Sequence, residues 1–429
     1  MRRVLIVAYH FPPCVGSSGV LRPLKFARYL PEFGWQPTVL TTQALAYEET
    51  DPRSLESVPE NLRVIRTWAF DVKKHLGIGG LYQDWMAMPD RWASWLFSAV
   101  ASGLRVLRSD KVDVIVTTFP LATAVLIGYV LHVLTGKPWV VDFRDSMTED
   151  NYPSSAFRRR IWRWIERKAI KHAERLLFTA ASTRRMYLSR YPGLPPHKCL
   201  LISNGYDEED LQGFDGGAGN RGQNGALRLL HTGMLYREER DPRPFFRALS
   251  RLKREGVITS ESLRVTLRNP CSEDFYQRLL NELSIADIVS IEPHLPHHEA
   301  LAECADSDSL LLFQAASCDH QIPAKAYEYL RLGKPVLALT TETGDTAALL
   351  NEVGGATIVN LASDEAIYQR LPDFLAAIRS GTHALPSQEK IQHYSRRSQA
   401  GQLAKCLSEI VGTAAAIPTV SVTGTKLAS

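Results

Sequence analysis

The sequence is poor in cysteine, and its cysteines follow no recognisable spacing. Six of them are scattered through 429 residues, at positions 14, 199, 271, 304, 318 and 406, without a CxxC pair. Such spacing fits neither a disulfide framework nor a zinc site. We therefore expect free thiols and a reducing, cytoplasmic environment.

Long hydrophobic runs are also missing. The longest apolar stretch, residues 121–136, is interrupted by His132, and it is shorter than the roughly 20 residues that span a bilayer. The N-terminal run "VLIVAY" is too short for a signal peptide. We expect a cytoplasmic protein without a transmembrane segment. The formal net charge of +4 is too small to indicate nucleic-acid binding, and we expect none.

Known phosphate-binding motifs are absent from a place where one would be expected. The loop "YHFPPCVGSSGVLRP" joins an apolar run to a helical pattern, yet Gly16 and Gly19 fit neither GxGxxG nor the Walker pattern. Glycine-rich turns of this kind hold anions at a helix N-terminus, and Ser17, Ser18 and Arg22 add donors. The alternative is a tight connection that needs glycine only for its backbone angles.

What the sequence does contain is a regular alternation of short apolar runs and helical patterns. Strands are predicted at 3–9, 37–42, 63–67, 112–119, 138–144, 176–180 and 199–203. Helices are predicted at 19–33, 91–109, 121–135, 157–174 and 182–190, with Gly34 ending the first. Nearly continuous apolar runs are typical of strands buried on both faces of a parallel sheet.

The alternation stops at a Gly- and Asn-rich segment, 213–226, and then starts again. Strands follow at 227–233, 264–268, 287–292, 309–314, 335–340 and 356–360. Helices follow at 242–255, 272–283, 296–304, 323–332 and 365–379, and an amphipathic segment covers 388–411.

This organisation predicts an α/β protein with two Rossmann-like, doubly wound domains and an interdomain cleft. The predicted parts are an N-terminal domain (1–205), a linker (206–226), a C-terminal domain (227–387), a helix returning to the first domain (388–412) and a disordered tail (413–429).

Two groups of polar residues follow strands of the second domain. In "LLHTGMLYREERDPRPF" a strand ends near His231, a Thr232–Gly233 turn follows, and Arg237, Arg240 and Arg243 precede or begin a helix. Phosphate binds bidentate arginine and helix N-termini; a solvated basic helix start is the alternative.

The second group lies in "DHQIPAKAYEYLRLGKPVLALT". A helix is expected to begin around Pro323, which suits a first turn. Lys325 lies in that turn and Glu328 one turn later. The spacing allows Glu328 to face the loop, although a surface glutamate would look the same.

Taken together, the motifs resemble those of nucleotide-sugar glycosyltransferases of the GT-B fold, with glycosyltransferase family 4 the nearest in pattern. The matching segments occur in the family's order: "FPPCVGSSGVLRPLKFARYLPEFGWQPTVLT", "PDRWASW", "PWVVDFRDSM", "ISNGYD", "LLHTGMLYREERDPRPF" and "IPAKAYEYLRLGKPVLALT". Each segment is loose by itself, but six in order are specific.

The resemblance implies roles for particular residues at the donor site. Gly16 and Gly19 match the family's N-terminal glycine loop, which approaches the donor diphosphate and the acceptor. Thr232, Gly233 and Arg240 match its diphosphate-binding segment.

The family's pair of glutamates is only half present. Glu328 matches the second, whereas His320 stands at the first, so the family's first sugar-binding carboxylate is missing here. Pro323 replaces a usual glycine, and the backbone N–H groups of Ala324 and Lys325 remain able to reach phosphate.

A carboxylate after a strand of the first domain is the candidate catalytic group. Strand alternation in "DFRDSM" sends Asp142 and Arg144 to one side and Phe143 and Asp145 to the other. Asp145 would orient or deprotonate an acceptor hydroxyl, with Arg144, Arg22, Ser17 and Ser18 on the acceptor side. The alternative is an Asp–Arg pair that only holds the loop.

The resemblance further implies a retaining reaction without a protein nucleophile, in which the leaving phosphate accepts the acceptor's proton. We expect no cofactor beyond the nucleotide sugar and no metal, because cations surround the diphosphate. Asp306-Ser-Asp308 has the form DxD, but it precedes a strand, where acids are ordinary.

A basic stretch leaves one further question open. Residues 154–198 contain twelve Lys and Arg against two acids. A solvated helix packed on the sheet is one interpretation, and contact with anionic lipid on the inner face of the cytoplasmic membrane is the other. The Trp- and Met-rich segment 81–97 would add an apolar edge or belong to the core.

The sequence therefore predicts a glycosyltransferase that moves a sugar from a nucleotide-sugar donor to a saccharide or lipid-linked acceptor, in cell-surface polysaccharide or glycoconjugate synthesis. A nucleotide-sugar 2-epimerase of the same fold and a non-catalytic sugar-nucleotide-binding protein are the alternatives.

Overall fold

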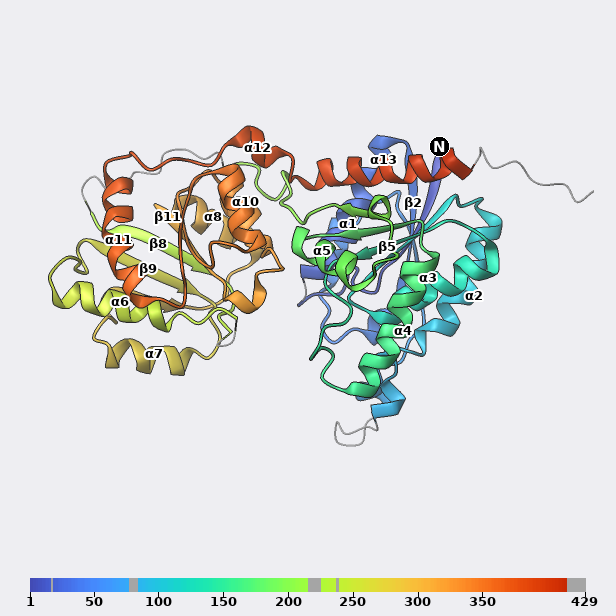
Figure 1. Ribbon diagram of the computed structural model, residues 1–429, viewed down its shortest axis with the longest axis horizontal. Coiled ribbons are helices and arrows are strands. Elements are labelled where there is room, and N and C mark those ends of the chain that lie inside the picture. The colour runs from blue at the N-terminus through green and yellow to red at the C-terminus, as the bar shows by residue number, and fades with distance from the viewer. Residues whose placement is uncertain (17, 77–83, 215–224, 237–238, 415–429) are drawn as a thin grey trace, which may run out of the picture. The chain divides into compact units, whose positions relative to one another are not determined.

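The chain forms two compact units. In the computed structural model, which describes residues 1–16, 18–76, 84–214, 225–236 and 239–414, unit 1 comprises Met1–Phe178, Pro192–Ile202 and the residues from Ala400 on. Unit 2 comprises Thr179–Tyr191 and Ser203–Gln399. Figure 1 shows a sheet flanked by helices in each unit.

The sheet of unit 1 has seven strands in the order β3-β2-β1-β4-β5-β6-β7, and all neighbouring strands are parallel. The strands are β1 (Arg2–Val7), β2 (Trp35–Thr42), β3 (Arg63–Thr67), β4 (Val114–Thr118), β5 (Trp139–Phe143), β6 (Arg175–Phe178) and β7 (Cys199–Leu201). The chain runs outwards from β1 in both directions, which is the doubly wound arrangement expected from strand–helix alternation.

Helices cover both faces of this sheet (Figure 1). One core contains Val4, Val116 and Val140 of the strands together with α1 (Leu21–Tyr29) and α13 (Arg396–Ala414), which contributes Leu403 and Leu407. The other face carries α2 (Trp95–Ser109), α3 (Ala122–Thr135) and α4 (Ala156–His172), where α3 packs against both of its neighbours.

Helix α3 approaches the sheet unusually closely at Gly128. A Cβ atom at this position would lie 2.2 Å from Cγ2 of Thr117 and 2.5 Å from Nε1 of Trp139. These two side chains are joined by a 2.9 Å hydrogen bond from Trp139 Nε1 to Thr117 Oγ1. Only glycine fits between the helix backbone and this pair.

The sheet of unit 2 has six parallel strands in the order β10-β9-β8-β11-β12-β13. They are β8 (Leu227–Thr232), β9 (Leu263–Arg268), β10 (Val289–Glu292), β11 (Ser309–Phe313), β12 (Val336–Leu339) and β13 (Ala356–Val359). The helices of unit 2 are α5 (Ala181–Arg190), α6 (Arg243–Arg254), α7 (Glu273–Glu282), α8 (His297–Asp306), α9 (Ala324–Arg331), α10 (Asp345–Val353), α11 (Asp364–Arg379) and α12 (Gln388–Gln392).

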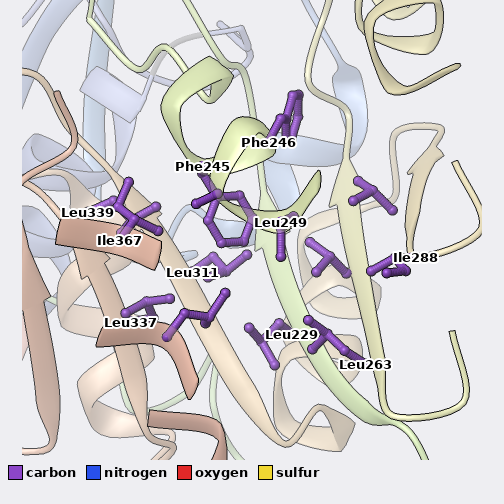
Figure 2. Packing of buried hydrophobic residues seen from close by; sticks show 14 of the residues in the cluster. Leu229, Phe245, Phe246, Leu249, Leu263, Ile288, Leu311, Leu337, Leu339 and Ile367 are labelled. Atoms are coloured by element: carbon purple, nitrogen blue, oxygen red, sulfur yellow. The ribbon is translucent and has the colours of Figure 1, made fainter. Parts of the chain in front are cut away.

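Alternate residues of these strands enter two different cores, as the period of a strand requires. Leu229, Leu311 and Leu337 pack with α6, α7 and α11 (Figure 2). Their neighbours Leu230 and Leu310 pack on the opposite face with α8, α9 and α10. Burial on both faces explains why the strands appear in the sequence as continuous apolar runs.

The predicted fold class is confirmed, and each of the thirteen predicted apolar runs overlaps a strand. Helix α10 was not predicted. The segment 388–411, read as one amphipathic stretch, is two helices, because Ser395 forms a bridge to Tyr206 between them. Helix α9 begins at Ala324, so Pro323 is its N-cap residue and does not lie within its first turn.

Candidate active site

In each sheet the strand order reverses at one point, between β1 and β4 in unit 1 and between β8 and β11 in unit 2. Ligands of doubly wound sheets bind outside the carboxyl ends of the strands at such a point. The loops that leave these strands are therefore the candidate sites.

In unit 2 the chain turns sharply at Gly233, immediately after β8. Its φ of +102° is disfavoured for other residues, and a Cβ atom there would lie 2.9 Å from Nζ of Lys325. The Lys325 ammonium also donates a hydrogen bond to the carbonyl oxygen of Thr232. The Thr232–Gly233 turn and the start of α9 thus form one surface.

A neutral histidine lies beneath this surface. Nδ1 of the buried His231 lies 2.9 Å from the carbonyl oxygen of Leu311. Since a carbonyl only accepts, Nδ1 carries the proton and Nε2 is left as an acceptor 3.5 Å from Lys325 Nζ. Burial, with the charge of Lys325 adding to it, holds the pKa of His231 well below its usual range.

Lys325 itself titrates near neutrality. Burial lowers its pKa to about 7, the positive charge of Arg240 adds to the lowering, and Glu328 opposes it. Two cations that disfavour each other's charge gain most when an anion binds between them. This arrangement is suited to a ligand such as a diphosphate.

Arg240 and Arg243 differ although they lie three residues apart. The Arg240 guanidinium donates to the carbonyl oxygen of Met234 at 3.2 Å and lies 5.5 Å from the ring centre of Tyr236. Arg243 is neutralised by Asp241 at 2.7 Å. Of the predicted arginines, only Arg240 therefore presents a charge without a carboxylate partner among the described residues, and Arg237 lies outside them.

Glu328 and His320 occupy different surroundings. Oε1 of Glu328 lies 3.2 Å from Nε2 of His297, and the Glu328 side chain is 19% exposed. His320 lies in the loop before α9, where its carbonyl oxygen accepts from Thr183 Oγ1 at 3.0 Å. The structure thus brings together Thr232, Gly233, Arg240, Lys325 and Glu328. His320 instead hydrogen-bonds to Thr183 of α5 and to the neighbouring Gln321.

In unit 1 the predicted cation Arg22 is paired with groups of the fold itself. Its guanidinium binds Asp142 through two hydrogen bonds of 2.8 and 2.9 Å and donates a third, of 2.9 Å, to the carbonyl oxygen of Ile202. Both side chains are almost completely buried. The pair ties α1 to the ends of β5 and β7.

Arg144 and Asp145 lie next to this pair. Arg144 donates to the carbonyl oxygen of Gly19 at 2.8 Å and so fixes the glycine loop. Burial lowers the pKa of Arg144, whereas the negative charges of Asp145 and Asp142 raise it. The half-buried Asp145 therefore lies close to a cation. Ser17 lies outside the described residues, and of Ser18 only the backbone is described.

A small cavity of about 150 Å³ adjoins the glycine loop. Tyr9, His10, Cys14, Val15, Gly16, Glu48, Glu49 and Trp92 line it. Burial and the charge of Arg144 lower the pKa of His10 to about 4, so the cavity carries carboxylates and a neutral imidazole. His10, Glu48, Glu49 and Trp92 could not be grouped from the sequence, because they come from three separate segments that only the fold brings together.

The DxD sequence has a structural role. Asp306 forms a 2.8 Å ion pair with Arg228, and Asp308 accepts a 2.9 Å hydrogen bond from the Arg228 backbone N–H. Across the described ranges, no cluster of three or more His, Cys, Asp or Glu has the arrangement of a metal site.

Comparison with solved structures places the fold. The chain matches sucrose-phosphate synthase of Thermosynechococcus elongatus with 13% identity and a TM-score of 0.63, covering 96% of this chain and 100% of that one. It matches a glycosyltransferase of Rickettsia africae with 14% identity and a TM-score of 0.62, covering 96% of this chain and 98% of that one. It matches HepE of Anabaena in complex with UDP and glucose with 14% identity and a TM-score of 0.61, covering 95% of this chain and 100% of that one. The two doubly wound sheets are those of the GT-B fold.

The family comparison then defines the protein more narrowly. Residues 21–205 match the model of the glycosyl transferase 4-like domain, and none of the curated proteins matches the sequence. The chain has the GT-B fold, and its residues 21–205 are similar to the glycosyl transferase 4-like domain. The resemblance seen in the sequence motifs is confirmed.

Proposed function

We propose that this protein is a glycosyltransferase. It would transfer a hexose from a uridine diphosphate sugar to a saccharide or lipid-linked acceptor, with retention of configuration, in the synthesis of a cell-surface polysaccharide or glycoconjugate. The observation that carries the proposal is the group of cations around Gly233. Arg240 and Lys325 hydrogen-bond only to neutral carbonyl and imidazole groups among the described residues.

The donor diphosphate is proposed to bind at these two cations. Gly233 leaves room for a phosphate oxygen, and the N–H groups of Ala324 and Lys325 begin a helix and have no acceptor within it. HepE, whose structure contains UDP and glucose, has the same fold, and this supports uridine as the first nucleotide to test.

Glu328 is proposed to accept hydrogen bonds from ribose or sugar hydroxyls. It is half-buried one turn beyond Lys325, so a ligand that reaches the ammonium also passes the carboxylate. His320, in place of the family's first glutamate, would contact the sugar through its imidazole ring. This difference supports a donor sugar whose hydroxyl pattern differs from the family's usual one.

The glycine loop of unit 1 is proposed to serve the acceptor. Glu48 and Glu49 disfavour a phosphate in the cavity beside Gly16, whereas carboxylates and the Trp92 ring suit sugar hydroxyls and the apolar face of a sugar. Asp145 is proposed to orient the attacking hydroxyl. Arg22 and Arg144 would act by holding the loop in place.

The chemistry requires no group that the chain lacks. The acceptor oxygen forms a bond to the anomeric carbon as the bond from that carbon to the phosphate oxygen breaks, and the leaving phosphate takes the acceptor's proton on the same face. Arg240 and Lys325 would stabilise the charge that develops on the leaving diphosphate. We propose neither a metal nor a cofactor for this step.

A donor screen tests the proposal. Thermal shift with UDP-, GDP-, ADP- and CMP-sugars should give the largest stabilisation with one UDP-sugar. NMR of that donor should show an unchanged sugar until a saccharide acceptor is added, and a product with the donor's anomeric configuration afterwards. Epimerisation of the donor without acceptor, or binding without turnover over a broad acceptor panel, would contradict transfer.

A further inference from the structure

Helix α4 presents a basic outer face. Between Ala156 and His172 it contains seven Arg and Lys residues and a single acid, Glu166. Glu166 is completely buried and accepts a 3.1 Å hydrogen bond from Thr148 Oγ1. The outer face of the helix therefore carries no negative charge of its own.

Aromatic side chains alternate with the cations on this face. Phe157 is 58% exposed and Trp164, two turns later, is 48% exposed. Arg160, Arg163, Arg167 and Lys171 are exposed between and beyond them, and none of the four has an ion pair within the described part of the chain. Nζ of Lys168 lies 5.5 Å from the Trp164 ring centre.

The C-terminal half of α3 continues this surface. Tyr129 contacts Trp164, with 6.4 Å between ring centres, and Val133 follows one turn later on the same side of α3. Val133 and Leu134 are 56% and 58% exposed. We call Val133, Leu134, Phe157, Trp164 and the cations of α4 the α3–α4 surface.

Helix α6 in unit 2 is also basic, but three of its cations have carboxylate partners. Its exposed Arg247 pairs with Asp364 at 3.0 Å, Arg251 with Glu365 at 2.6 Å, and Lys253 with Asp287 at 2.6 Å. These three cations of α6 have carboxylate partners, whereas Arg160, Arg163, Arg167 and Lys171 of α4 have none among the described residues.

We propose that the α3–α4 surface docks on the interfacial region of an anionic lipid bilayer. Unneutralised Arg and Lys are attracted to anionic headgroups, and Trp and Phe are the residues favoured at the headgroup level. No helix in the described ranges is long and apolar enough to cross a membrane. In the proposed contact, α3 and α4 lie along the bilayer surface. The exposed aliphatic pair Val133 and Leu134 favours lipid, whose acyl chains offer a continuous apolar phase, over nucleic acid, whose apolar surface is confined to its bases.

Vesicle cosedimentation tests this surface without any sugar substrate. The full chain is mixed with vesicles of phosphatidylcholine alone or of an equimolar mixture with phosphatidylglycerol. We expect binding only to the mixed vesicles and at least a tenfold loss in the double variant Arg163→Gln/Arg167→Gln. The matched control, Arg247→Gln/Arg251→Gln, removes the same charge from α6 and should bind as the parent does.

A second pair of variants separates lipid insertion from attraction by charge alone. Phe157→Ala/Trp164→Ala keeps every cation and should also lose at least tenfold in vesicle binding, with an unchanged circular dichroism spectrum. Equal losses in the α4 and α6 arginine variants would overturn the proposal, as would parental binding by either α4 variant. Binding of a single-stranded RNA that vesicles fail to compete would overturn it in favour of nucleic acid.

The result is independent of the transfer reaction. A protein that transfers sugar but does not bind mixed vesicles contradicts this inference alone, and one that binds vesicles through α4 but does not turn over contradicts only the proposed function.

Discussion

The carboxyl ends of the two sheets have the same topology, but the arginine and lysine side chains at these ends have different partners. In unit 1, Arg22 is buried in a bidentate pair with Asp142. In unit 2, Arg240 and Lys325 are left with carbonyl oxygens as their main partners. Topology thus fixes where a ligand can bind, and under the proposed function the pairing of side chains decides which unit binds the anion.

The largest effect is expected from breaking the buried pair of unit 1. Asp142→Ala would leave the Arg22 charge buried without its partner, and we expect a loss of about 3–5 kcal/mol in the free energy of unfolding. Urea unfolding measures it. The control is Asp364→Ala, which removes the exposed partner of Arg247 and should cost about 0–1 kcal/mol; equal losses would mean that the pair in unit 1 is not special.

Asp145 tests whether unit 1 contributes to turnover. If it positions or deprotonates the acceptor hydroxyl, Asp145→Asn should lower kcat about 100-fold or more, with donor affinity unchanged because the cations lie in unit 2. The exposed Asp150→Asn serves as the control. A lower melting temperature together with parallel losses of turnover and donor binding would instead identify Asp145 as structural.

Arg240 and Arg243 form a matched pair for testing the proposed anion site of unit 2. Arg240→Gln should weaken binding of the nucleotide sugar by about 1.5–3 kcal/mol, the scale of a hydrogen bond to a charged group. Arg243→Gln should change it little, because Asp241 already neutralises that arginine. Isothermal titration calorimetry measures both, and similar losses would place the diphosphate elsewhere.

The smallest effect concerns pH. Below its pKa of about 7 Lys325 is a cation, and above it the side chain is neutral. Affinity for a nucleotide sugar, whose diphosphate does not titrate near neutrality, should therefore fall about fivefold as pH rises through this value, a difference of about 1 kcal/mol. Lys325→Met should bind more weakly and lose this dependence, whereas a pH profile unchanged by the substitution would assign the titration to another group.

The strands could be predicted because burial on both faces makes each of them an unbroken apolar run, as in β11 and β12. Helix α10 could not, since it begins after Gly344 without a side-chain N-cap and, unlike α9, without a proline at its start. The break between α12 and α13 depends on Gly205, where a Cβ atom would lie 1.7 Å from the carbonyl oxygen of Tyr394. Such a contact between distant segments leaves no local pattern.

The residues of the site also fall into those that the sequence could predict and those that only the fold reveals. Gly233 and Arg240 could be proposed because they follow a predicted strand in a recognisable order. The neutral state of His231 depends on a carbonyl of β11, and the partner of Arg22 lies 120 residues away at Asp142. Local spacing identifies which groups are available, but only the tertiary fold determines which of them keep their charge.

The close approach of α3 to the sheet at Gly128 has a consequence for mutational tolerance. Any side chain at this position would meet Thr117 and Trp139 and push α3 outwards, and α4, which packs against α3, would move with it. The absence of a side chain at the buried Gly128 thus determines how far the outer helix α4 lies from the sheet. In a saturation mutagenesis scan, Gly128 should accept no substitution, while Arg160 and Arg163, on the helix that it supports, should tolerate most replacements for folding.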